Sequence, residues 1–163
     1  MSTFDSWVAS LGRSMTPEAR TLLRRIFQQH GPVSSEYVER IGHEHQIALA
    51  RVAVDLVGRD IAATMDQQVP PFECRYEEGA VRVAFWGRYA TTTVAGLTQQ
   101  DVTVEVAEFL QEEVIRDLQR TWPECPEHRA GLRASRDSER AAWTCRRGGH
   151  VVAAVGELRP STA

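Results

Sequence analysis

The hydrophobic period of this chain changes at Pro70-Pro71, and this change constrains the fold class. Before the prolines, apolar residues recur at three- and four-residue steps, which is typical of amphipathic helices. Two consecutive prolines end a helix because proline lacks the backbone donor and its ring clashes with the preceding turn. After them, apolar and polar residues alternate over 80–86, as in a half-buried strand. We therefore predict an α+β fold with a helical region at 1–69, a small antiparallel hairpin and a long packed helix at 70–121, and a C-terminal hairpin at 122–158, all in one compact unit.

Local start and stop signals place the helices of the first region. Thr16 is a typical N-cap residue that is followed by a proline at the first helical position, and Gly31 ends the helix that begins there. Ser34 or Ser35 caps a further helix whose apolar residues continue to about Met65. Two glycines within this segment weaken the pattern, so one long helix and a broken pair of helices are both open.

Strand and turn signals dominate after the prolines, apart from one amphipathic helix. Glu77-Glu78-Gly79 separates two short apolar segments and predicts a hairpin turn. The remaining elements are expected, in chain order, as strands at 72–76 and 80–86, a third strand within 89–94, a helix at 102–120, a solvent loop at 129–140, and strands at 141–144 and 151–155.

Composition and charge indicate an ordinary globular protein. The net charge of -3 and the pI near 6.0 give no global attraction to nucleic acid or anionic lipid. All 19 basic residues are arginine, which is consistent with a GC-rich bacterial genome. No segment approaches the run of about 18 apolar residues that a membrane span needs, and the N-terminus lacks the basic start and apolar stretch of a secretory signal. We expect a reduced, cytoplasmic protein whose cysteines are thiols or metal ligands.

Two cysteines and two histidines near the C-terminus have the spacing of a zinc ribbon. The order is Cys125, two residues, His128, sixteen residues, Cys145, four residues and His150. Zn²⁺ prefers four thiolate or imidazole ligands in a tetrahedron, and two short ligand pairs separated by a hairpin supply them. Gly148-Gly149 allows the tight turn that would bring His150 back toward Cys145. We predict a structural zinc bound by these four residues in a zinc-ribbon-like hairpin, which has little core of its own.

Three other interpretations of this cluster stay open. The metal could be held by only three of the residues, because the spacing before His150 is longer than the common two-residue spacing. The cysteines could instead be buried small apolar residues, and the histidines exposed loop residues. A catalytic zinc would keep an open position beside a general base, which either Glu124 or Glu127, on the two sides of Cys125, could supply. Carboxylates are common on polar loops, so we favour structural zinc.

The C-terminal segment also resembles a recurring module. Trp122-Pro123-Glu124-Cys125-Pro126-Glu127-His128, followed by Ala142-Trp143-Thr144-Cys145 and an apolar end, is similar to the ending of a set of small uncharacterised bacterial proteins. The resemblance covers about 102–158 and leaves the helical half unmatched. Members of that set often carry a second histidine two residues after the first. Ala130 occupies this position here, so the resemblance implies that His150 completes the ligand set, and it implies no particular reaction.

Three further patterns have functional interpretations. His43-Glu44-His45 is a poor chelating pair on a helix because neighbouring positions point in different directions, and His45 lies on the apolar stripe, as expected of a hydrogen-bonded core histidine. Cys74 could be a nucleophile if a histidine and an acid lay near it, but structural burial is the favoured expectation. Residues 22–61 and the following hairpin could form a winged helix-turn-helix, although they lack the basic face that DNA requires.

Five arginines give the C-terminal region a local basic patch, which is either a solvated loop or a contact surface for an acidic partner: Arg133, Arg136, Arg140, Arg146 and Arg147. We predict a non-enzymatic accessory or protein–protein interaction protein with a structural zinc and no catalytic residues. The alternatives are a winged-helix-like DNA-binding regulator and a small hydrolase that uses Cys74 or an open zinc site. A protein partner is expected, a nucleic acid is less favoured, and a membrane is not expected.

Overall fold

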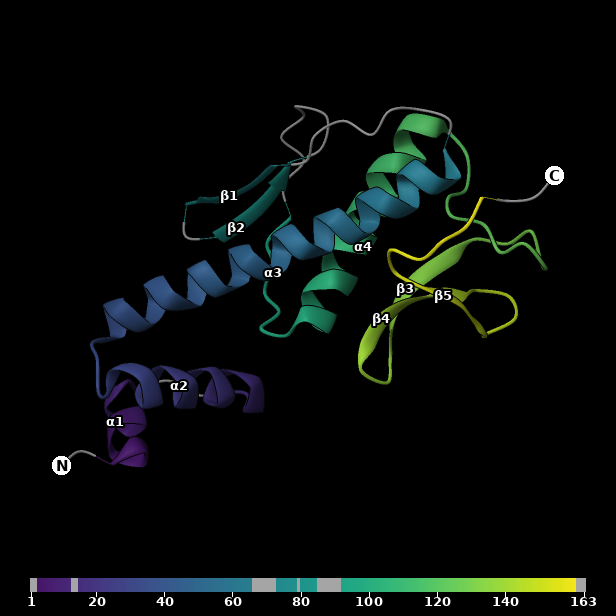
Figure 1. Cartoon of the computed structure of the whole chain (residues 1–163). Coiled ribbons are helices and arrows are strands. Elements are labelled where there is room, and N and C mark those ends of the chain that lie inside the picture. Colours follow the sequence, from purple (N-terminus) through teal and green to yellow (C-terminus); the bar gives the residue numbers. More distant parts are fainter. Residues whose placement is uncertain (1–2, 13–14, 66–72, 79, 85–91, 161–163) are drawn as a thin grey trace.

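The predicted α+β class is confirmed by the computed structural model, which describes residues 3–12, 15–65, 73–78, 80–84 and 92–160 (Figure 1). Within these ranges β1 and β2 form one antiparallel sheet, and β3, β4 and β5 form a second antiparallel sheet in that spatial order. The elements, in chain order, are α1 (Phe4–Ser10), α2 (Pro17–His30), α3 (Ser35–Thr64), β1 (Glu73–Glu77), β2 (Ala80–Ala84), α4 (Gln99–Leu118), β3 (Leu132–Asp137), β4 (Arg140–Cys145) and β5 (Val151–Ala154).

The helices begin at capped positions. A hydroxyl of the N-cap residue accepts a hydrogen bond from the N–H three residues later in all four, with the caps at Thr3, Thr16, Ser34 and Thr98. The alternative left open by the two glycines is decided, because α3 is one continuous helix of 30 residues. Each glycine costs a helix about 1 kcal/mol relative to alanine, so the packing of α3 must offset this cost.

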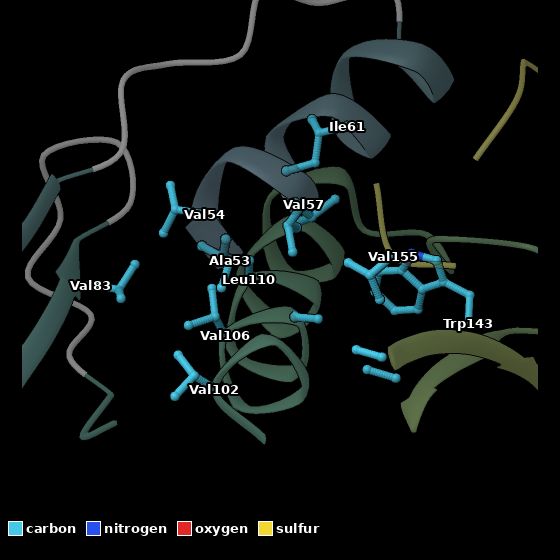
Figure 2. Packing of buried hydrophobic residues seen from close by; sticks show 14 of the residues in the cluster. Ala53, Val54, Val57, Ile61, Val83, Val102, Val106, Leu110, Trp143 and Val155 are labelled. Carbon is cyan, nitrogen blue, oxygen red and sulfur yellow. The ribbon is translucent and has the colours of Figure 1, made fainter. Parts of the chain in front are cut away.

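The main core lies where the second half of α3 crosses α4 (Figure 2). Two alanines on α3, Ala50 and Ala53, are fully buried and allow the two helices to approach closely. Valines of β2 cover one side of this helix pair, and the sheet of β3, β4 and β5 covers another. The largest fully buried side chains of this core come from all of these elements: Leu110, Leu132, Val57, Val81, Val83, Val102, Val106, Val114 and Trp143.

The N-terminal helices form a smaller apolar cluster of their own. Trp7, Leu23 and Ile26 are buried between α1, α2 and the first half of α3. The indole N–H of Trp7 donates to the carbonyl oxygen of Val33 at 2.8 Å, which fixes α1 against the turn between α2 and α3. In Figure 1 this part of the molecule projects from the main core along the first half of α3.

One predicted loop and the start of one predicted helix differ from the structure. The predicted solvent loop at 129–140 is wrong, because half of it is the strand β3, in which buried Leu132 and Ala134 alternate with exposed Arg133. Only two apolar residues, Leu132 and Ala134, mark this strand, and its pairing with β4 comes from the tertiary fold. The predicted helix at 102–120 starts earlier, at Gln99. Of the predicted third strand, 89–91 lies outside the described residues, and Thr93 forms an isolated bridge with Arg82.

A buried carboxylate joins the C-terminal sheet to α3. Asp60 has no exposed surface and accepts three hydrogen bonds, from the indole N–H of Trp143 at 2.7 Å, from the N–H of Gly156 at 2.7 Å and from the N–H of Leu158 at 2.8 Å. Burial raises the pKa of Asp60, and the three donors oppose this effect by favouring the ionised form. This junction fixes β4 against the end of α3.

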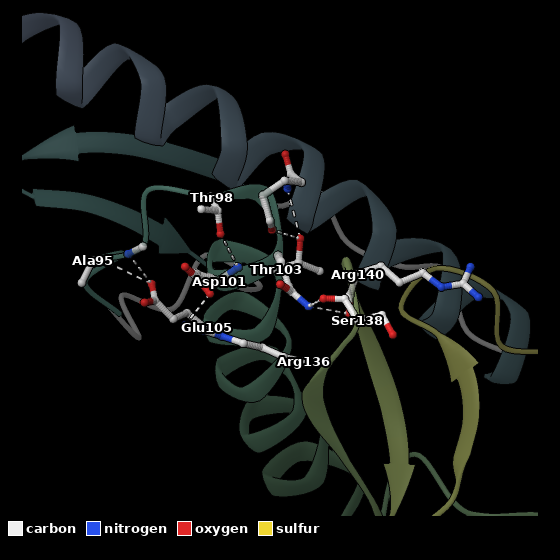
Figure 3. A network of polar contacts seen from close by, with 11 residues as sticks. Ala95, Thr98, Asp101, Thr103, Glu105, Arg136, Ser138 and Arg140 are labelled. Atoms are coloured by element: carbon white, nitrogen blue, oxygen red, sulfur yellow. Dashed lines mark hydrogen bonds and ion pairs between the residues drawn. The ribbon is translucent and has the colours of Figure 1, made fainter. Parts of the chain in front are cut away.

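The turn between β3 and β4 is held against the start of α4 (Figure 3). The side-chain amide of Gln100 donates to the carbonyl oxygens of Ser138 at 3.3 Å and of Arg140 at 3.0 Å. The guanidinium of Arg136 pairs with the carboxylate of Asp101 at 2.5 Å. Together with the Asp60 junction, these contacts fix two separate places on the C-terminal sheet against the helices.

Candidate metal centre

Four ligand atoms converge at the end of the C-terminal sheet. The Sγ atoms of Cys125 and Cys145 and one ring nitrogen each from His128 and His150 all lie within 4.8 Å of one another. The sulfur of Cys125 is 3.6 Å from Nδ1 of His128 and 3.6 Å from Nε2 of His150, and the sulfur of Cys145 is 3.7 Å from Nδ1 of His128. These four residues, called the metal centre below, could hold a metal ion.

The separations match a tetrahedral ion. With metal–sulfur bonds of about 2.3 Å and metal–nitrogen bonds of about 2.0 Å, tetrahedral geometry puts sulfur and nitrogen roughly 3.5 Å apart. The three observed separations of 3.6, 3.6 and 3.7 Å lie close to this value. Ordinary burial of two cysteines does not require two imidazoles at these separations, so the geometry favours metal binding over that alternative.

The two ligand-bearing turns share one backbone hydrogen-bond pattern. In each turn the cysteine N–H donates to the carbonyl five residues later, and the N–H four residues later donates back to the cysteine carbonyl. We call 125–130 the first knuckle and 145–150 the second knuckle. The bonds are Cys125 N to Ala130 O at 2.8 Å, Arg129 N to Cys125 O at 2.9 Å, Cys145 N to His150 O at 2.9 Å and Gly149 N to Cys145 O at 2.9 Å.

The two knuckles also share a left-handed residue at their fourth position after the cysteine. This residue is Arg129, with φ of 50°, in the first knuckle and Gly149, with φ of 69°, in the second. Such a conformation turns the chain sharply enough to close a short loop. Two segments that are unlike in sequence therefore present their cysteines in the same way.

The knuckles differ in the position of the histidine, and Gly148 explains the difference. His128 is the third residue after its cysteine, whereas the third residue of the second knuckle is Gly148. A Cβ atom at this position would lie 2.7 Å from Cε1 of His128 and 2.7 Å from Nδ1 of His150. The space that a side chain would take is filled by both imidazoles, so the second histidine ligand comes two residues later.

The environment of the metal centre favours thiolate ligands. Cys125 and Cys145 are buried, whereas the two histidines are half-buried. The N–H of Gly148 donates to the sulfur of Cys145 at 3.2 Å, and this hydrogen bond lowers the pKa of the Cys145 thiol. A thiol that ionises more readily is a better metal ligand, because the thiolate is the form that binds.

Two residues that position this region gave little or no sequence signal. The sequence indicates Gly148 only as part of the tight turn before His150, and its role in making space for both imidazoles requires the three-dimensional arrangement. Asp60 was missed, although it follows Leu56 and Val57 on the apolar face of α3. An acidic residue at a core position of a helix is the signal that could have identified it.

Three of the five arginines in the predicted patch make contacts within the chain. Arg136 pairs with Asp101, and Arg140 lies 3.8 Å from a carboxylate oxygen of Glu157. Nε of Arg146 donates to the carbonyl of Leu132 at 3.4 Å. All five arginines of the patch are exposed, so the predicted basic surface is present, although three of its members also make these contacts within the chain.

The remaining candidates lie apart from this centre. Cys74 is in a cleft of about 500 Å³ between α3 and β1, lined by Arg51, Val54, Asp55, Glu73 and Arg75 besides the cysteine. Burial raises the pKa of Cys74 to about 11, which disfavours a nucleophilic thiolate. His45 hydrogen-bonds through Nε2 to the carbonyl of Leu97 at 3.0 Å, as expected of a core histidine. His43 instead stacks on Tyr76, with 4.2 Å between ring centroids.

Among the residues that the structure describes, the metal centre is the one group of histidine, cysteine and acidic side chains with metal-binding geometry. In the same residues, no helix is long and apolar enough to cross a membrane. Comparison with protein-family models, with curated proteins and with solved structures finds no match to this chain.

Proposed function

We propose that this chain is a non-enzymatic interaction protein whose C-terminal ribbon is stabilised by one structural Zn²⁺. The observation that carries the proposal is the convergence of two sulfurs and two imidazole nitrogens at tetrahedral separations. Zinc is the metal that this donor set suits best, since thiolate and imidazole bind it without redox chemistry. With four protein ligands the coordination shell is closed, which favours a structural role over a catalytic one.

The metal part of the proposal is tested on the full chain. Native mass spectrometry of protein produced with zinc is expected to show one ion per chain, and a chelator is expected to lower the melting temperature. Cys145→Ala should abolish both effects, whereas Cys74→Ala, the matched control at the thiol outside the centre, should keep them. Absence of bound metal in the wild type, together with a melting curve that the chelator leaves unchanged, would contradict the structural zinc.

The interaction part is tested by capture of a partner from the native source. The zinc-loaded wild type is expected to retain a defined protein that Cys145→Ala retains less well, and the purified pair should rebind. Duplex DNA that binds with a steep loss of affinity in salt would support the DNA-binding regulator instead. Turnover of a hydrolysable substrate that depends on Cys74 or on the metal would support the hydrolase.

A further inference from the structure

One acidic side chain of the first knuckle lies beside the metal centre without belonging to it. A carboxylate oxygen of Glu127 is 3.9 Å from Nε2 of His150, the nitrogen that faces the sulfur of Cys125. Its carboxylate is therefore close to one of the four ligand atoms, the ring nitrogen of His150 in the second knuckle.

This carboxylate lies on the open side of the centre. The cysteines are almost fully enclosed, with exposed fractions of 0% for Cys125 and 1% for Cys145. The side chains of His150 and Glu127 are 35% and 71% exposed. His150 and Glu127 are therefore among the groups that an ion from solvent can meet before it reaches the enclosed sulfurs.

The distance also suits a carboxylate that can take a place in the coordination shell. Two ligand atoms each about 2.0 Å from a tetrahedral ion are roughly 3.3 Å apart, and carboxylate oxygen binds zinc at such a distance. The observed 3.9 Å between Glu127 and His150 exceeds this by little, and the exposed glutamate side chain can make up the difference. The backbone of His150 is held by the N–H of Cys145, so exchange of the ligand needs only the imidazole to turn away.

We propose that Glu127 is an exchange ligand through which a divalent ion enters and leaves the metal centre, an inference that rests on the proposed metal-binding function. During uptake, a carboxylate oxygen of Glu127 replaces one water of the hydrated ion. The lone pair of Nε2 of His150 then displaces that oxygen as the ion reaches the two thiolates. Release follows the same steps in reverse, with no redox change.

The test uses Co²⁺ as the probe, with the full reduced chain and four variants. Glu127→Gln should slow Co²⁺ uptake roughly five- to tenfold at low salt, because it removes one negative charge from the path of a dication. Glu124→Gln, which removes an exposed carboxylate on the other side of Cys125, should change the rate less than about twofold. His150→Ala should still bind one Co²⁺ with a four-coordinate absorption spectrum, and His150→Ala combined with Glu127→Gln should bind at least about tenfold more weakly.

Equal uptake rates for Glu127→Gln and Glu124→Gln would overturn the proposal, because they would show an effect of overall charge alone. Equal Co²⁺ affinity for His150→Ala with and without Glu127→Gln would overturn it as well. Failure of the wild type to bind Co²⁺ at all is a different result, which refutes the metal centre itself and with it the proposed function.

Discussion

Replacement of Gly148 by alanine tests whether the two imidazoles are held together by a metal ion. The new Cβ would lie 2.7 Å from Cε1 of His128 and from Nδ1 of His150, whereas ordinary contacts begin at about 3.4 Å. Each ring atom must therefore move by about 0.7 Å. Metal–ligand bonds tolerate about 0.2 Å, so at least one imidazole loses its bonding position when an ion is present.

The magnitude of the loss differs between the metal-bound and metal-free chains. Displacement of a ligand of this kind costs about 10- to 100-fold in metal affinity, or about 1.4–2.7 kcal/mol. Without a metal, the half-buried imidazoles can rotate away from the new methyl group, and the free energy of unfolding should change by less than about 0.5 kcal/mol. Gly148→Ala should therefore resemble the wild type in the presence of a chelator and differ from it when zinc is added.

The assay is competition for Zn²⁺ with a chromophoric chelator, together with thermal unfolding with and without zinc. Gly42→Ala is the matched control, because no heavy atom lies within 4 Å of its added Cβ. This change should stabilise α3 by about 1 kcal/mol and leave the zinc affinity unchanged. Zinc affinity of Gly148→Ala equal to that of the wild type would refute the reasoning that both imidazoles are fixed around one ion.

Three further outcomes concern the junction, the core and the free thiol. Because burial raises the pKa of Asp60 above its ordinary 3.8, its stabilising contribution is greatest at low pH and is lost as the pH rises through the raised pKa. Urea unfolding should therefore show the stability advantage of the wild type over Asp60→Asn shrinking as the pH rises above about 4, and a constant difference would contradict this. The side-chain amide of Gln111 on α4 donates to the buried carbonyl oxygens of Trp122 at 3.0 Å and of Leu132 at 2.8 Å. Gln111→Leu removes this donor and should lower the free energy of unfolding, measured by urea unfolding, by about 2 kcal/mol. A loss under about 0.5 kcal/mol would argue against these hydrogen bonds. With the pKa of Cys74 at about 11, iodoacetamide at about pH 8 should modify this thiol about 100-fold more slowly in the folded chain than in urea, as followed by mass spectrometry, and equal rates would show that the thiol is not buried.

The helical half was predictable from sequence because its signals are local. Thr16 and Ser34 act as caps, and Gly31 ends α2 at a positive φ of 72°. Each of these roles depends on residues within one turn of the chain. The continuity of α3 was not predictable in the same way, because the cost of its two glycines is offset by packing against α4, which is remote in sequence.

The C-terminal region was predictable only where its chemistry is local. The ligand spacing identified the metal centre, since the two short pairs are readable from sequence. The strand β3 was missed because Leu132 and Ala134 carry little apolar signal without the neighbouring β4. Asp60 contacts residues 83, 96 and 98 positions away in the chain, and no local pattern reports contacts of that range.

The metal centre and the Asp60 junction both contain residues of β4, so this strand is held in place by more than a metal ion. Cys145, one of the four residues of the metal centre, lies at one end of β4, and Trp143, two residues earlier, donates to Asp60 on α3. Leu132 and Trp143 are buried in the core shared with α3 and α4, so the ribbon already has apolar cover that small free-standing zinc domains lack. The knuckles themselves have little such cover, since five of the six residues of the second knuckle are polar or glycine. A metal ion in this chain would therefore order the two knuckles, while the helices and the Asp60 junction hold the strands in place.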